Sequence, residues 1–296
     1  MAAENKLSPA GLDFTPTTRH DTYEYIKPEK LDLTNCAVLI TGASKGIGRE
    51  TALSYARAGA SFIAIAARSP LDTLKDELEA ASRTAGRQPP HVLPLQVDVT
   101  DLSNVEKAAK EVESAFGRLD IVINNAGYLE PFKKMLDADP AEWKRSYEVN
   151  VFGVYHVARA FMPLLLKTTD GLKQVLNLSS VGAHFTMPGG SAYQPTKLAV
   201  LRFSAFIGLE YPELLSYAIH PGGVQTELSS NMGKQYEHLL TDTPQLSADS
   251  IVWLSAERRE WLQGRYVSVT WDMAELLEKR KKIEDEDLLK VRMAVA

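Results

Sequence analysis

Short, uninterrupted runs of apolar residues alternate along the chain with longer stretches in which apolar residues recur at helical spacing. Seven runs of this kind are candidate strands, at 36–40, 61–67, 91–97, 119–124, 174–179, 216–220 and 265–270. A run without polar alternation is typical of a strand that is buried on both faces of a parallel sheet. We expect helices between the runs, one ending near Ala58 and others at 71–86, 103–116, 140–167, 193–211 and 246–260.

This order of elements predicts a single α/β domain over residues 35–272, with a doubly wound, Rossmann-like sheet of seven parallel strands and helices on both faces. Residues 1–34 are polar, contain three prolines and show no sustained period. We expect them to form an extension that packs on this domain or on a neighbouring subunit. Residues 273–296 are rich in charge and carry leucines at partly helical spacing, which predicts a solvated or interface helix.

Composition and charge narrow the class of protein. The chain of 296 residues has a formal net charge of −5 and a pI of about 5.8, which argues against a non-specific nucleic-acid binder. Cys36 is the only cysteine, so an internal disulfide and a cysteine-based metal site are excluded, and the six histidines show no metal-ligand spacing. The apolar runs are too short to cross a bilayer, and the first residues lack the pattern of a secretory signal. We therefore expect a cytoplasmic protein with no metal and no membrane partner.

The first apolar run ends in the stretch TGASKGIG (41–48), where a strand meets a helix. Gly42 can turn the chain sharply, Gly46 has no side chain to block a diphosphate, and Gly48 lets the helix pack close to the strand. The helix N-terminus adds free N–H groups and a partial positive charge for the phosphates. An ordinary strand–helix turn is the alternative, but three glycines within seven residues at this junction favour a nucleotide-binding loop.

Further polar and turn-forming residues follow the ends of other expected strands. Five of them stand where a strand ends and its connection begins: Arg68, Asp98, Asn124, Ser180 and Pro221. Ligands of open α/β sheets bind outside the carboxyl ends of the strands. The sequence therefore predicts a ligand site along this edge of the sheet.

Tyr193 and Lys197 lie four positions apart, so on a helix that starts near residue 193 they share one face. A free tyrosine has a pKa near 10 and is a poor acid–base catalyst at neutral pH, whereas a neighbouring lysine cation favours tyrosinate. Pro195 fits the first turn of a helix, which places the helix start at about Tyr193. The spacing alone leaves open that the pair is two surface residues on one helical turn.

A series of short motifs follows the glycine loop: DV (98–99), NNAG (124–127), VNVFG (149–153), LSS (178–180), YQPTK (193–197) and PGGVQT (221–226). Each is weak alone, but their order and spacing together are specific. From about residue 35 to 270 the chain resembles a short-chain dehydrogenase/reductase of the single-domain type. The resemblance implies hydride transfer between a nicotinamide cofactor and a ketone or secondary alcohol.

The resemblance also implies four catalytic residues. Tyr193 is expected to be the general acid in carbonyl reduction and the base in alcohol oxidation, tuned by Lys197, which also binds the nicotinamide ribose. Ser180, thirteen residues before Tyr193, is expected to hold the substrate oxygen, with Ser179 as its rival. Asn150 is expected to anchor a water that relays protons to the lysine. An asparagine that bends a helix is the alternative.

The same motifs imply the cofactor-binding residues. These are Gly42, Ser44, Lys45, Gly46, Ile47, Gly48, Arg68, Asp98, Val99, Asn125, Ala126, Gly127, Tyr193, Lys197, Pro221, Gly222, Val224 and Thr226. Ala67 stands where members that prefer NAD(H) carry an acid, and Arg68 follows it, with Lys45 facing the same region. A guanidinium fits a 2′-phosphate, so we expect NADP(H), with NAD(H) as the alternative. Asp98 is expected to contact adenine or, alternatively, to cap a helix.

The substrate side is less defined by the sequence. Residues 227–245 are where the family places a substrate lid, and His184 is more consistent with substrate contact or packing than with catalysis. The family often ends its fold in DGG, whereas this chain reads TWDM (270–273). With the N-terminal extension, that ending resembles fungal members, many of them in secondary metabolism. The resemblance also implies a small-molecule substrate and a homo-oligomer, a dimer or tetramer formed through the fifth and sixth helices.

Two other functions are compatible with the same fold, because fold does not fix function. A regulatory protein that senses the cofactor ratio would use the nucleotide site but would not need a tuned tyrosine. A dehydratase or epimerase would keep the fold and the cofactor but would not consume NADPH stoichiometrically.

Overall fold

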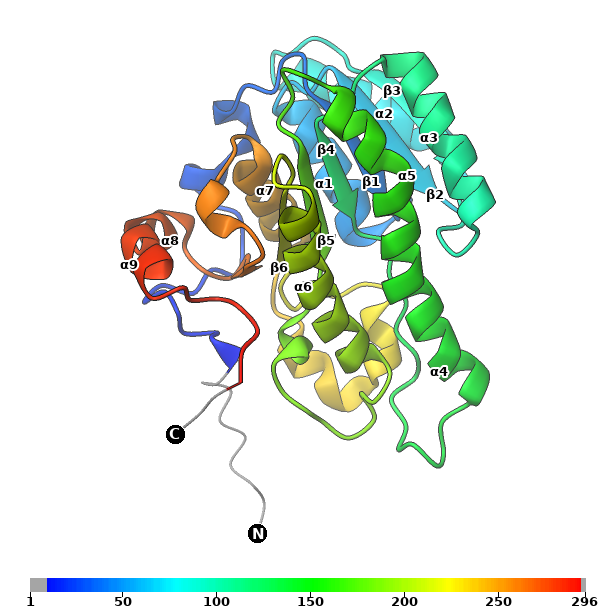
Figure 1. Cartoon of the computed structure of the whole chain (residues 1–296), viewed down its shortest axis with the longest axis vertical. Coiled ribbons are helices and arrows are strands. Elements are labelled where there is room, and N and C mark those ends of the chain that lie inside the picture. The colour runs from blue at the N-terminus through cyan, green and yellow to red at the C-terminus, as the bar shows by residue number, and fades with distance from the viewer. Residues whose placement is uncertain (1–9, 294–296) are drawn as a thin grey trace.

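The seven apolar runs form one parallel sheet in the computed structural model, which describes residues 10–293 (Figure 1). Neighbouring strands, in the order β3-β2-β1-β4-β5-β6-β7, are all paired in parallel. The strands are β1 Ala37–Thr41, β2 Phe62–Ala67, β3 His91–Gln96, β4 Ile121–Asn124, β5 Gln174–Leu178, β6 Leu215–His220 and β7 Tyr266–Ser268. This confirms the predicted doubly wound α/β fold.

Helices cover both faces of the sheet, which is why the strands are apolar throughout. On one face α1 packs between α2 and α7, and on the other α5 packs beside α3, with α6 over β5 and β6 (Figure 1). The strand order reverses between β1 and β4, and in such sheets this switch point opens the crevice in which ligands bind. The helices are α1 Gly46–Arg57, α2 Asp72–Thr84, α3 Leu102–Phe116, α4 Pro140–Tyr147, α5 Val154–Lys167, α6 Tyr193–Glu210, α7 Pro244–Ser255, α8 Met273–Glu278 and α9 Arg280–Asp285.

The stretch 140–167 is helical throughout but is not one regular helix. A π-helical turn, Glu148–Gly153, joins α4 to α5. In this turn Gly153 approaches Val99 so closely that a Cβ atom there would lie 2.7 Å from Val99 Cγ2. By length and composition the stretch could cross a membrane, with a mean hydropathy of 1.4 in its most apolar window, but 56 % of that window is buried inside the protein. Burial of this kind is typical of a core helix.

The N-terminal segment packs against the body of the protein from residue 10 onwards. Thr18 pairs with Trp271 in an isolated β-bridge. Two 3₁₀ turns follow, Glu24–Ile26 and Pro28–Lys30, and both pack on α7, where Ile26 is fully buried. The described part of the extension therefore packs on its own domain, which is one of the two arrangements expected from the sequence.

The charged C-terminal segment is also packed against the sheet. It folds into two short helices, α8 and α9, instead of the one solvated or interface helix expected from its charge. Leu276 and Ile283 are fully buried in the core, which explains the difference. Trp271 is 1 % exposed and lies 4.9 Å from Phe14 between ring centres. The aromatic ending of the fold is therefore a packing contact between the two ends of the chain.

Candidate active site

The glycine loop at the carboxyl end of β1 is held in place by the stretch that follows β4. Gly42 has a φ of +67°, and a Cβ atom there would lie 2.8 Å from Asn125 Nδ2 and 2.9 Å from Ala126 Cα. Only glycine fits this turn. Asn125 Nδ2 in turn donates to the backbone oxygens of Thr41, at 2.8 Å, and of Gly42, at 3.2 Å. The two motifs thus fix one another at the switch point of the sheet.

The N-terminus of α1 fits a diphosphate. Among the described residues, no side chain caps the helix, so its first N–H groups are available to a ligand. Gly46 has a φ of +56°, and a Cβ atom there would lie 3.3 Å from Thr226 Cγ2 in the segment after β6. A side chain at this position would fill the space between the two segments. The donors and the space are those that a dinucleotide requires.

The other predicted nucleotide contacts lie along the same edge. Ser44 and Ile47 are partly buried within the loop, with Ile47 packed against the core. Val99 is buried beside the π-helical turn, and Gly127 lies near Asn150.

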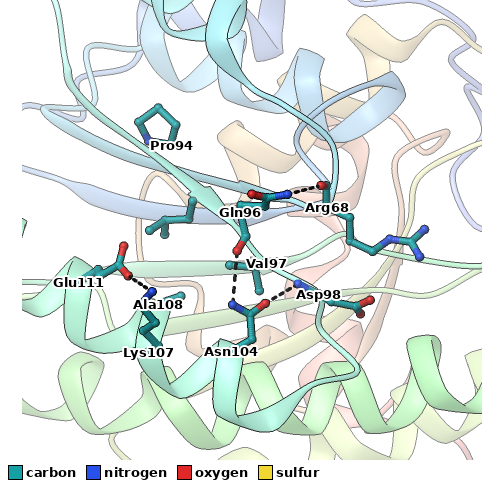
Figure 2. Close-up of a pocket in the computed structure, with 10 residues that line it drawn as sticks. Arg68, Pro94, Gln96, Val97, Asp98, Asn104, Lys107, Ala108 and Glu111 are labelled. Atoms are coloured by element: carbon teal, nitrogen blue, oxygen red, sulfur yellow. Dashed lines mark hydrogen bonds and ion pairs between the residues drawn. The ribbon is translucent and has the colours of Figure 1, made fainter.

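A pocket of about 570 Å³ lies at the ends of β2 and β3 (Figure 2). Arg68 and Asp98 project from these two strand ends toward the same side of the pocket, as Figure 2 shows. Arg68 is exposed, and within residues 10–293 its guanidinium has no hydrogen-bond or ion-pair partner. An unpaired guanidinium at the end of β2 is suited to a phosphate group.

Asp98 does not cap the following helix. Its carboxylate accepts from Thr100, at 3.0 Å from the backbone nitrogen and 2.8 Å from Oγ1. The cap of α3 is Asp101, which accepts from the N–H groups of Ser103 and Asn104. The helix-cap alternative considered for Asp98 is therefore wrong.

Lys45 contacts the predicted lid. Its Nζ lies 2.5 Å from a carboxylate oxygen of Glu227, and both side chains are mostly exposed. An exposed ion pair contributes little free energy, so a phosphate can compete for the lysine. The sequence did not predict this contact between the glycine loop and the first lid residue.

α6 begins at Tyr193, in agreement with the position of Pro195 in its first turn. Ser180, at the end of β5, lies near enough to Tyr193 to favour the ionised form of its hydroxyl. Ser179 is buried instead and donates to the backbone oxygen of Lys197 at 2.8 Å. Because successive residues of an extended chain point to opposite sides, only one of the two serines faces the tyrosine. Of the two candidates, Ser180 is the one that contacts Tyr193.

Lys197 is buried one helical turn after Tyr193. Its Nζ lies 5.4 Å from the centre of the tyrosine ring and donates to the backbone oxygen of Leu178 at 2.9 Å. Burial lowers the pKa of Lys197 to about 8. Burial also raises the pKa of Tyr193 to about 12; the nearby Ser180 side chain opposes this rise and the charge of Glu130 adds to it. The surroundings as a whole thus raise the pKa of Tyr193, whereas Lys197 alone was expected to lower it.

Asn150 lies in the π-helical turn and is fully buried. Its side chain accepts from Tyr128 N at 2.8 Å and donates to Tyr128 O at 2.7 Å and to Thr196 Oγ1 at 3.1 Å. These bonds join the loop after β4 to the first turn of α6.

The segment after β6 is held by residues that the sequence did not single out. Asp242 accepts from Gly223 N at 2.6 Å, and Ser247 donates to Pro221 O at 2.5 Å. His20 Nδ1 lies 2.6 Å from the other carboxylate oxygen of Asp242, although the two residues are 222 positions apart. Neither His20 nor Asp242 belongs to a sequence motif, so their contact could not be predicted from the sequence.

A buried acid beside α6 was also missed. Glu130 is 3 % exposed. Its Oε1 accepts from Tyr193 N at 3.0 Å, and its Oε2 accepts from Ser146 Oγ. Glu130 follows the NNAG stretch in an irregular loop, where no period separates buried from exposed positions. The sequence therefore offered no signal for it.

The predicted lid carries two 3₁₀ turns, Ser229–Met232 and Lys234–Leu239. Tyr236 on the second turn packs edge-on against Phe132 in the loop after β4, with 5.9 Å between ring centres. This contact holds the predicted lid against the loop that carries Glu130.

His184 packs edge-on against Tyr266, with 4.4 Å between ring centres. Burial lowers the pKa of His184, which favours a neutral packing residue over an acid–base catalyst. Within residues 10–293, no group of three or more His, Cys, Asp or Glu side chains is arranged to hold a metal ion.

Comparison with known proteins places most of the chain in one family. The family described as short chain dehydrogenase matches residues 36–237. The protein named short chain dehydrogenase mpl6, from Monascus purpureus, is 47 % identical over 288 residues, which cover 97 % of this chain and 98 % of that protein. Short chain dehydrogenase andI, from Emericella variicolor, is 39 % identical over 285 residues, which cover 96 % of this chain and 97 % of that protein.

Solved structures share the fold. An alcohol dehydrogenase from the archaeon Thermococcus sibiricus, complexed with 5-hydroxy-NADP, is 28 % identical with a TM-score of 0.67, covering 79 % of this chain and 95 % of that one. A 7α-hydroxysteroid dehydrogenase complexed with NADH and 7-oxo glycochenodeoxycholic acid has a TM-score of 0.70 and covers 84 % of this chain and 97 % of that one. At 24 % identity the second likeness is one of fold alone.

Proposed function

Because the chain belongs to the short-chain dehydrogenase family, we propose that it is an NADP(H)-dependent oxidoreductase that transfers a hydride between nicotinamide and a ketone or secondary alcohol. One observation carries the proposal. Ser180 lies beside Tyr193 and favours ionisation of its hydroxyl, and Lys197 lies one helical turn away, at the edge of the sheet where the glycine loop presents its free N–H groups.

In the reduction direction Tyr193 is the proton donor. Its raised pKa keeps the hydroxyl protonated at neutral pH, which is the form that a general acid requires. The bound nicotinamide supplies the hydride. Ser180 holds the carbonyl oxygen and stabilises the charge that develops on it. Lys197, with a pKa of about 8, exchanges protons near neutral pH and replaces the one that Tyr193 gives up, through a water at Asn150.

The preference for NADP(H) rests on Arg68. Its exposed guanidinium has no partner among the described residues and lies where the 2′-phosphate of the adenosine ribose is expected. Lys45 adds a second cation if it leaves Glu227. The two dehydrogenases compared above were solved with an NADP derivative and with NADH, so they favour neither cofactor and the proposed preference rests on Arg68.

The partners follow from the exposed surface. Five apolar side chains are exposed on α6, on α5 and in the turn before it: Phe152, Tyr155, Leu198, Phe206 and Leu209. α5 and α6 lie side by side in Figure 1, and Tyr155 on α5 contacts Phe203 on α6. An exposed apolar surface of this kind marks a protein interface. We propose that this face forms a homo-oligomer in the cytoplasm, and that the substrate is a small molecule of secondary metabolism.

The proposed function is tested with a panel of ketones and secondary alcohols, followed by nicotinamide absorbance with NADP(H) and with NAD(H). We expect turnover that consumes NADPH stoichiometrically. Tyr193→Phe keeps the ring but loses the proton, so we expect it to bind NADPH with the affinity of the unmodified protein and to lose at least about 100-fold in kcat.

The same experiment separates the alternatives. A cofactor sensor would retain its full biological activity as Tyr193→Phe. A dehydratase or epimerase would convert substrate without net oxidation of NADPH. Turnover that is equally fast with and without the Tyr193 hydroxyl would exclude the proposed role of this residue.

A further inference from the structure

The first turn of α6, which carries Tyr193 and Lys197, is not capped by the residue that precedes it. That residue is Ala192, which makes no side-chain cap. Glu130, 63 residues earlier, supplies the missing acceptor, since its Oε1 lies 3.0 Å from the backbone nitrogen of Tyr193. A carboxylate at a helix N-terminus pairs with a free N–H group and is stabilised by the helix dipole. The cap of α6 therefore contacts the residue that bears the proposed catalytic hydroxyl.

Glu130 is fixed from two sides. Besides the N–H group of Tyr193, its carboxylate accepts from the hydroxyl of Ser146 on α4. α4 packs against α6, and Trp143 Nε1 donates to Ser191 Oγ at 3.3 Å just before α6 begins. The side chain of Glu130 is 3 % exposed, so solvent screens its charge much less than that of a surface acid.

Few titratable groups lie on the elements packed around the first turn of α6. They are Lys197 on α6, Glu130 in the loop after β4, His184 after β5, and Glu142 and Arg145 on α4. Glu142 and Arg145 are engaged with Tyr128. Burial lowers the pKa of His184, which leaves it neutral at physiological pH. Lys197 and Glu130 are therefore the two oppositely charged side chains that contact Tyr193.

We propose that Glu130 is a positioning residue for Tyr193: it fixes the first turn of α6 and opposes the formation of tyrosinate, so that Tyr193 stays a proton donor at neutral pH. This inference rests on the proposed function, in which Tyr193 is the acid–base group. A negative charge beside a tyrosine disfavours its anionic form. Carbonyl reduction uses the protonated form and proceeds at neutral pH, whereas alcohol oxidation uses tyrosinate and rises toward alkaline pH.

Glu130→Gln separates the charge from the hydrogen bonds, because the amide oxygen still accepts from Tyr193 N. We expect the alkaline decline of kcat/KM for reduction, and the rise of kcat/KM for oxidation, to move to lower pH by about one unit. Glu130→Ala loses the acceptor as well, so we expect kcat to fall about tenfold or more with little change in the KM for the cofactor. Glu142→Gln on α4 is the matched control and leaves both pH profiles in place.

A second measurement follows Tyr193 without turnover. The ¹³C resonance of the Tyr193 Cζ atom, identified by its loss in Tyr193→Phe, reports ionisation directly, and in Glu130→Gln we expect it to titrate at lower pH. If turnover depends on Tyr193 but neither the profiles nor the resonance move in Glu130→Gln, Glu130 has no such role. If no carbonyl is reduced but the resonance moves, the proposed function fails and the link between Glu130 and Tyr193 stands.

Discussion

Two adjacent serines at the end of β5, Ser179 and Ser180, have different side-chain contacts. The hydroxyl of Ser179 holds the backbone of α6 at Lys197, whereas the hydroxyl of Ser180 accepts from Gly182 N and acts on the ionisation of Tyr193. The alternation of an extended chain accounts for the difference. A similar step of one position separates buried Ala67, at the end of β2, from exposed Arg68.

Substitution of Arg68 tests the proposed preference for NADP(H). In Arg68→Ala we expect the KM for NADPH to rise about tenfold or more while the KM for NADH stays nearly constant, because a charge-assisted hydrogen bond to phosphate contributes about 1.5–3 kcal/mol. Steady-state kinetics with both cofactors measure this. Arg83→Ala on α2, which removes an exposed guanidinium paired only with Glu79, is the control. Equal changes for NADPH and NADH would contradict the assignment.

At this scale, spacing and motifs identified the residues whose partners are near in sequence or belong to a family pattern. Tyr193, Lys197 and Ser180 were predicted in this way, and the structure brings them together. Glu130 and Asp242 were not, because each has a partner far along the chain: Tyr193 is 63 residues from Glu130, and His20 is 222 residues from Asp242. A carboxylate in an irregular loop carries no periodic signal for such a contact.

Among the elements, the N-terminal segment supports the cofactor side of the site. His20 contacts Asp242, whose other oxygen accepts from Gly223 in the segment after β6. Thr22, two residues later, donates instead to Asp249 on α7 at 2.6 Å. The N-terminal segment thus has one contact that supports the segment after β6, where cofactor contacts are proposed, and another that holds only the helix α7.

This pair of contacts allows a matched experiment. In His20→Ala we expect the KM for NADPH to rise several-fold, because Asp242 loses the partner that fixes it against Gly223. His20→Asn restores an N–H donor near the position of Nδ1 and is expected to recover most of the affinity. In Thr22→Val, which loses a hydrogen bond of about 1 kcal/mol, we expect a lower Tm and an unchanged KM. An equal rise in KM in Thr22→Val would point to general destabilisation.

Strands and long helices were predictable because burial gives them a regular pattern, and each strand boundary lies within two residues of its predicted position. The π-helical turn was not, since it depends on the close approach of Gly153 to Val99. Nor were the short helices α8 and α9, whose burial depends on neighbours distant in sequence. Tertiary contacts override local pattern in both places.

For the whole molecule, the exposed apolar side chains of α5 and α6 are the feature that supports a homo-oligomer. Leu209 is 73 % exposed and Phe206 47 % exposed. We expect the double variant Phe206→Glu with Leu209→Glu to sediment as a smaller species with an unchanged circular dichroism spectrum, because charges in the centre of an apolar interface are not compensated. Leu136→Glu, at a site that is 98 % exposed in the loop before α4, is the control. An unchanged mass would place the interface elsewhere.

The contacts between the two ends of the chain also constrain how the protein is made. Thr17 and Arg19 bind the carboxylates of Glu275 and Asp272, so residues that leave the ribosome early find their partners more than 250 residues later. Contacts between segments so distant in sequence form late in folding, because loop closure must precede them. A growing chain can assemble β1 to β6 before Thr17 and Arg19 meet these partners. The contacts that the N-terminal segment makes near the segment after β6 are therefore completed only when synthesis is nearly over. Until then, a partly made chain has an incomplete site.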